Sequence, residues 1–168
     1  MDPQNFEEPG IELERLAEEQ INDLNSDSED RLRRGKERRE RVVALYAAGL
    51  ITNGPDNYHA ALVMLYGEER AHFDLARTFA RRAAALGDSR AWSLVAAAWD
   101  RALLARGEPQ RFGTQFVREE GRWTLGKVDP SVTDSLRAFY GVPPLWVQQQ
   151  SADQLQRRWQ RKGAVRPI

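Results

Sequence analysis

Six side chains that donate or accept hydrogen bonds mark where this sequence could do chemistry. They are an imidazole, a carboxylate, a guanidinium, a hydroxyl and two amides: His59, Asp100, Arg101, Gln110, Thr114 and Gln115. The last three lie in the segment GEPQRFGTQF, residues 107–116, directly after a run typical of a helix. Amides and hydroxyls at this density either bind a polar ligand or satisfy the backbone of a tight corner. Both interpretations stay open, and we favour the structural one.

A catalytic role would fall to His59 and Asp100. A histidine that acts as a general base needs a carboxylate or hydroxyl within hydrogen-bond reach. The sequence contains no nucleophile elbow, no Walker loop, no dinucleotide glycine fingerprint and no His-Glu-x-x-His motif. We therefore assign no catalytic residue. The alternative is a small enzyme, for example a hydrolase, with a polar pocket at the Gln-Thr-Gln corner.

Composition narrows the classes of ligand and partner. The chain has no cysteine and only two histidines, so neither thiolate nor histidine-rich metal sites can form. We expect no metal and no cofactor. Lys plus Arg and Asp plus Glu are equal at 25 each, so no overall field favours nucleic acid, which we do not expect as a partner. No apolar run approaches about 18 residues and no signal peptide is evident, so we expect a cytoplasmic protein without membrane contact.

Charge is distributed in blocks along the chain. Residues 1–30 are acidic, with Arg15 as their only base, whereas the segment from Arg31 begins RLRRGKERRERV. Such blocks either bind partners or pair with one another, and we favour pairing between the first two. The sequence leaves open whether the acidic helical segment 1–30 is ordered. It also leaves open a homo-oligomer in which charged ends pair between subunits.

Glycines divide the middle of the chain at nearly regular intervals. Gly49, Gly67, Gly87 and Gly107 each follow apolar residues at helical spacing, and Asp56 is expected to open one of these helices. Gly49 suits a left-handed C-terminal cap. Alanines alternate with large apolar side chains, as in helices that approach closely. The pattern predicts a short repeat of helix pairs.

A β-hairpin is predicted at about 114–127. The segment TQFVREEGRWTLGK reads as two strands around Glu120-Gly121. In that register Arg118 faces Trp123 and can stack on its indole. Because an isolated ribbon is marginal, it must pack on the helices. We predict a mainly α fold in which residues 31–168 form one helical-repeat domain with this hairpin.

The helical part resembles the Sel-like subclass of tetratricopeptide repeats. The resemblance lies in LYAAGLITNGPDNYHAA, which carries Leu45-Tyr46, Gly49, Asp56 and Ala61, and in the following LYGEERAHFDLARTFARRAAALGDSRAWSL. There the pattern recurs at these positions: Leu65-Tyr66, Gly67, Asp74, Ala76, Ala83-Ala84, Gly87, Ala91 and Leu94. It covers roughly a third of the chain and implies a tetratricopeptide-like fold.

A second resemblance involves the corner. The chain is similar to an uncharacterised bacterial family with an Asp-Arg pair, Gly-x-Pro-Gln, and an aromatic-Gly-Thr-Gln run before a hairpin. The matching positions are Asp100, Arg101, Gly107, Pro109, Gln110, Phe112, Gly113, Thr114 and Gln115. This resemblance implies a shared fold and carries no activity.

The most direct functional prediction is non-enzymatic binding of a protein or peptide. Stacked helix pairs form a concave groove, which suits such a partner. We expect the binding residues to be the six named at the outset: His59, Asp100, Arg101, Gln110, Thr114 and Gln115. A closed pocket with His59 beside an acid would instead support the enzyme.

Overall fold

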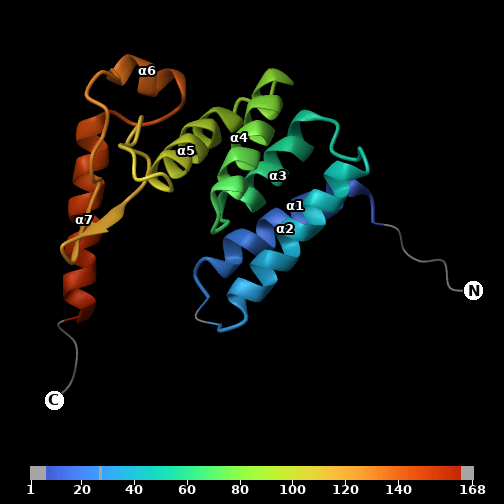
Figure 1. Ribbon diagram of the computed structural model, residues 1–168, viewed down its shortest axis with the longest axis horizontal. Coiled ribbons are helices and arrows are strands. Elements are labelled where there is room, and N and C mark those ends of the chain that lie inside the picture. Colours follow the sequence, from blue (N-terminus) through green and yellow to red (C-terminus); the bar gives the residue numbers. More distant parts are fainter. Residues whose placement is uncertain (1–6, 27, 164–168) are drawn as a thin grey trace, which may run out of the picture.

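Seven helices and one hairpin make up the part of the chain that the computed structural model describes, residues 7–26 and 28–163 (Figure 1). In chain order they are α1 (Pro9–Asp23), α2 (Arg31–Ala47), α3 (Gly54–Leu65), α4 (Arg70–Ala85), α5 (Ala91–Leu104), β1 (Val117–Glu119), β2 (Arg122–Thr124), α6 (Asp134–Phe139) and α7 (Leu145–Gly163). The predicted mainly α fold with a small C-terminal hairpin is confirmed.

Helices α1 to α5 pack against one another around one apolar core, with α3 between α1 and α4, and α4 against α5 (Figure 1). Large side chains such as Val63 and Phe79 are fully buried there. Small ones, including Ala60, Ala76 and Ala80, are buried beside them. Small residues between large ones let helix axes approach closely. The packing is compatible with a repeat-like helical fold.

The helix ends follow the sequence signals with one difference. Gly49 ends α2 with a φ of 71°, the left-handed conformation expected of a C-terminal glycine. Helix α3 begins earlier than Asp56, because the Asn53 side chain is the N-cap and accepts a hydrogen bond of 2.8 Å from the Asp56 N–H. Pro55 fits the first turn, since a proline there loses no helical hydrogen bond.

Ion pairs join the acidic α1 to the basic α2, as the charge blocks predicted. Asp23 accepts hydrogen bonds from Arg34 at 2.7 Å and from Arg38, and Glu12 pairs with Arg41 at 2.6 Å. The hydrogen bonds from Arg34 and then Arg38 hold the pKa of Asp23 well below its ordinary value. Burial of Leu13 in the core adds an apolar contact that salt does not screen.

The C-terminal part packs on α5 through a second apolar cluster. Phe112 is fully buried there, and its ring lies 4.7 Å from Tyr140 and 5.9 Å from Trp99. The two strands pair antiparallel and place Arg118 opposite Trp123, as predicted. The predicted stacking of Arg118 on Trp123 is wrong. Helix α7 packs along β2, and the Arg118 guanidinium lies 4.5 Å from the ring of Trp159.

None of the described helices combines the length and the apolar character that a membrane span requires.

Candidate functional site

Asp100 organises the corner that follows α5. Its side chain is fully buried and its oxygens accept four hydrogen bonds. Three come from backbone N–H groups: Arg111 at 2.7 Å, Phe112 at 3.0 Å and Thr114 at 2.9 Å. The fourth comes from the Thr114 hydroxyl at 2.8 Å. The carboxylate therefore fixes the turn that directs the chain from helix to hairpin.

Two glutamines complete the corner. Gln110 is fully buried; its Oε1 accepts from the Gln115 N–H at 2.8 Å, and its amide donates to the carbonyls of Gln115 and Leu125. The Gln115 Oε1 accepts from Arg101 Nε at 2.9 Å, and its amide donates to the Thr114 hydroxyl at 3.0 Å. Arg101 also donates to the carbonyl of Leu65, at 2.9 Å. The corner is thereby tied to α3 and to the hairpin.

The structure brings together five of the six predicted site residues and leaves the sixth elsewhere. Asp100, Gln110 and their neighbours direct these hydrogen bonds to one another and to the backbone. His59 lies on α3 and lines a different hollow, together with Glu14 and Glu18 of α1. Burial lowers the pKa of His59, which favours the neutral imidazole. His59 and Asp100 are not brought together as the base and acid that the enzyme alternative requires.

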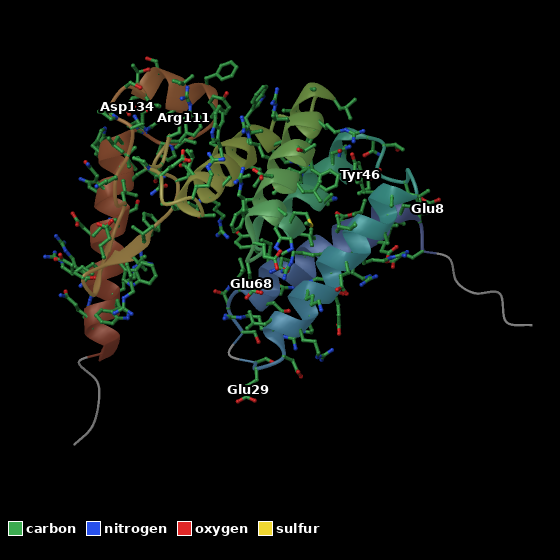
Figure 2. All side chains as sticks on the ribbon, in the orientation of Figure 1. Glu8, Glu29, Tyr46, Glu68, Arg111 and Asp134 are labelled. Atoms are coloured by element: carbon green, nitrogen blue, oxygen red, sulfur yellow. The ribbon has the colours of Figure 1, made fainter. Side chains whose placement is uncertain are left out.

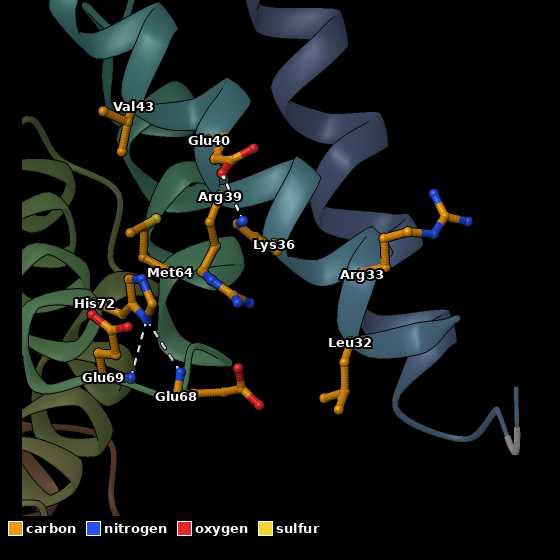
Figure 3. A pocket seen from close by; sticks show the side chains of 10 residues that line it. All are labelled: Leu32, Arg33, Lys36, Arg39, Glu40, Val43, Met64, Glu68, Glu69 and His72. Atoms are coloured by element: carbon orange, nitrogen blue, oxygen red, sulfur yellow. Dashed lines mark hydrogen bonds and ion pairs between the residues drawn. The ribbon is translucent and has the colours of Figure 1, made fainter. Parts of the chain in front are cut away.

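An open hollow of about 580 Å³ lies between α2 and the start of α4 (Figure 3). It is lined by Leu32, Arg33, Lys36, Arg39, Glu40, Val43, Met64, Glu68, Glu69 and His72, and we call it the α2–α4 groove. Beyond the groove α2 and α4 meet where the Tyr46 and Phe79 rings lie 5.2 Å apart, edge to face. In Figure 2 Glu68 marks the groove and Arg111 marks the corner, well apart in the molecule.

The groove combines exposed apolar side chains with a buried arginine. Leu32 and Val43 of α2 are 60% and 45% exposed, and the lining also includes the buried Met64 of α3. Arg39 is only 6% exposed, and its Nε has no hydrogen-bond partner among the described residues. Burial lowers the pKa of Arg39, an effect that the nearby Glu68 and Glu69 oppose across the groove. Such a patch differs from the corner, where the polar groups satisfy one another.

His72 shapes the acidic side of the groove. Its Nδ1 accepts hydrogen bonds from the backbone N–H groups of Glu68 at 3.2 Å and Glu69 at 3.1 Å (Figure 3). These bonds require an unprotonated Nδ1, and burial lowers the pKa of His72 in the same direction. Gly67 lies so close to His72 that a Cβ at this position would overlap the imidazole. The His72 side chain thus helps to hold the connection between α3 and α4, beside backbone hydrogen bonds such as that from the Gly67 N–H to the Met64 carbonyl at 3.1 Å.

The groove residues were missed when the sequence was analysed for chemistry. The candidate residues predicted from the sequence are His59 and polar groups at or near the corner, and none of them lines the groove. One signal was available: Leu32, Lys36, Arg39 and Val43 recur at spacings of three and four, so they form one row on α2. In that row the apolar Leu32 and Val43 flank two cations, Lys36 and Arg39, on a helix that is rich in charged residues.

Comparison with known proteins identifies no relative that would assign either region. No family model, no curated protein and no solved structure matches the chain. What the corner and the groove do must therefore be inferred from their own geometry.

Proposed function

We propose that the protein is a non-enzymatic binding module that takes a segment of a partner protein in the α2–α4 groove. The exposed Leu32 and Val43, which line an open hollow of about 580 Å³ together with Met64, carry this proposal. Exposed apolar side chains that gather in a groove with a charged rim are typical of protein-interaction sites. The resemblance of the helical part to Sel-like tetratricopeptide repeats supports it, because such repeats stack helix pairs around binding grooves.

In this proposal the corner is architecture. Asp100, Gln110 and Thr114 use their polar groups to shape the chain between α5 and the hairpin. A ligand at this place would have to replace hydrogen bonds that are already made, which costs as much as it returns. A partner that binds in the groove does not have to replace existing contacts of Leu32 and Val43, because these side chains are exposed to water. Covering them is favourable without breaking any contact.

A peptide-display selection on the full chain tests the proposal. Binders are measured against the wild type, Val43→Glu and Leu86→Glu. Val43 lies in the groove, whereas Leu86 is an equally exposed apolar residue at the end of α4, outside the groove. We expect Val43→Glu to weaken binding at least about tenfold, because it places a charge against the apolar contact, and Leu86→Glu to leave it unchanged. Peptides that bind both variants like the wild type would refute the groove as the site.

A further inference from the structure

We infer that the segment bound in the α2–α4 groove is a helix carrying a carboxylate side chain that pairs with Arg39. This inference rests on the proposed function and names the chemistry of the partner. Its starting point is a charged side chain that is 94% buried yet leaves its Nε–H without an acceptor among the described residues. Buried charges are ordinarily paired and hydrogen-bonded. Because Arg39 also lines the open groove, a guanidinium without an acceptor among the described residues points to an acceptor supplied by a partner.

The local sequence explains why the Arg39 guanidinium remains in the groove. Gly35 lies one helical turn before it, and a Cβ at Gly35 would lie 3.2 Å from Arg39 Nη1. The missing side chain makes room for the guanidinium against α2. The nearby acceptors of α1 bind another residue, because Arg38 donates to Gln20 Oε1 at 3.2 Å and to Asp23. Arg39 consequently lines the groove, and its Nε has no acceptor within residues 7–26 and 28–163.

Charge complementarity selects a carboxylate. Arg33 pairs with Glu37 at 2.7 Å and Lys36 pairs with Glu40 at 3.6 Å. Arg39 is thus the arginine or lysine of the groove that has no ion pair within the described part of the chain. A guanidinium binds a carboxylate through two parallel hydrogen bonds. A phosphate would bring a second negative charge toward Glu68 and Glu69 on the other side, so a singly charged group fits better.

The row on α2 selects a helix as the occupant. Leu32 and Val43 are eleven residues apart, about 16 Å along the axis, with Arg39 between them. A partner helix laid along this row presents apolar residues at spacings of three and four and contacts both ends. An acidic residue at the edge of that apolar face then reaches Arg39. The predicted partner is an amphipathic helix with one glutamate or aspartate bordering its apolar stripe.

A double-mutant cycle on the full chain tests this inference. Amphipathic 18-residue helices with Glu, Gln or Lys at the positions that border a fixed apolar face are selected on the wild type. The best Glu peptide and its Gln counterpart are made with acetylated and amidated ends. A third peptide has Gln at that position and a free C-terminal carboxylate. Affinities are measured by fluorescence anisotropy with the wild type, Arg39→Gln, Arg39→Lys and the control Arg81→Gln, an exposed arginine of α4 outside the groove.

The expected result is a wild type that binds the Glu peptide at least about 30-fold more tightly than the Gln peptide, as for buried charge pairs. Arg39→Gln should remove the difference, Arg39→Lys should keep part of it, and Arg81→Gln should change it less than about threefold. If Arg39→Gln does not fold, the ratio of the affinities for the Glu and Gln peptides is compared between the wild type and Arg39→Lys. A smaller ratio with Arg39→Lys supports the inference, and equal ratios contradict it. Preference for the free C-terminal carboxylate over the glutamate would overturn the side-chain assignment.

The remaining outcomes separate the two proposals. Glu and Gln peptides that bind the wild type equally, and that both lose binding to Val43→Glu, would overturn the carboxylate inference and leave the proposed function standing. Peptide binding that does not depend on Val43 would overturn the proposed function itself. Sedimentation velocity adds one further check. A dimer that Val43→Glu abolishes would mean that a second copy of the chain fills the groove, which would refute a separate partner.

Discussion

Asp100 and Arg39 are buried charged side chains with opposite surroundings. The Asp100 carboxylate accepts four hydrogen bonds from the corner that it shapes. The Arg39 Nε donates to no described residue and borders an open groove. A satisfied buried charge stabilises one conformation, whereas an unsatisfied one costs free energy that a bound partner can return. We therefore assign a structural role to Asp100 and a role in partner recognition to Arg39.

Substitutions in the corner should therefore act on stability. Asp100→Asn places an amide N–H₂ against N–H donors, and we expect the free energy of unfolding to fall by about 2–4 kcal/mol. Thr114→Val removes only the hydroxyl hydrogen bonds and should cost about 1 kcal/mol. Urea denaturation of both variants measures these values. Equal, small losses would mean that Asp100 does not hold the corner.

At the level of the elements, much of the fold follows from local sequence. The glycines after helical runs, the hairpin turn at Glu120-Gly121 and the cross-strand pair of Arg118 and Trp123 were all predictable, because each depends on neighbouring residues. The stacking of Arg118 on Trp159 was not predictable, since it depends on where α7 packs. Long-range packing decides such contacts, and one sequence does not encode them in local pattern.

The candidate site shows the same division. Sequence reasoning singled out the corner because its polar residues are consecutive, and five of the six predicted residues do lie together. The α2–α4 groove joins residues from α2, α3 and the start of α4. The burial of Arg39 cannot be predicted before those helices are placed, whereas the hydrogen bonds of His72 are local contacts at the start of α4. The spacing of the row on α2 can be read from the sequence, but the exposure of its side chains cannot.

The connection between α3 and α4 should respond to acid through His72. Burial lowers its folded-state pKa below the ordinary 6.5; Arg39 acts in the same direction, while Glu68 and Glu69 oppose it. The unfolded chain therefore binds the proton first as the pH falls. The stability that neutral His72 contributes is fully present above about pH 6.5 and is lost as the pH falls through the lowered pKa.

His72→Asn isolates this effect. The asparagine side-chain oxygen can accept the same N–H groups as Nδ1 but does not titrate in this range. We expect the variant to lose less stability than the wild type between about pH 7 and pH 5 in thermal unfolding. His59, whose pKa is also lowered by burial, is unchanged in both proteins and serves as an internal reference. Parallel pH profiles would show that the His72 hydrogen bonds do not stabilise the connection.

For the whole molecule, α1 matters because it closes the core beside α3. The Arg41 side of its Glu12–Arg41 pair is exposed, so that pair contributes little once salt screens it, whereas the Asp23–Arg38 pair is largely buried and is screened less. Leu13, Leu16 and Ala17 are buried in the core, and their apolar contacts persist in salt. Apolar burial should therefore dominate the attachment of α1.

Limited proteolysis with a glutamate-specific protease measures this attachment, since Glu14 and Glu18 are exposed on α1. We expect cleavage there to change little between about 0.1 M and 1 M sodium chloride. Leu16→Ala should increase it strongly, because loss of a buried leucine costs about 2–5 kcal/mol. Release of α1 by salt alone would instead identify the ion pairs as its main attachment.

The central claim is that partners bind in the α2–α4 groove, and chemical-shift mapping tests it most directly. The isotope-labelled full chain is titrated with the selected peptide, and backbone amide and arginine Nε–H signals are followed. We predict that the shifts concentrate at residues 32–43, Met64 and residues 68–72, and that the Arg39 Nε–H signal moves with them. Shifts centred on Asp100 and residues 110–115, with the groove unchanged, would contradict the claim and return the binding site to the corner.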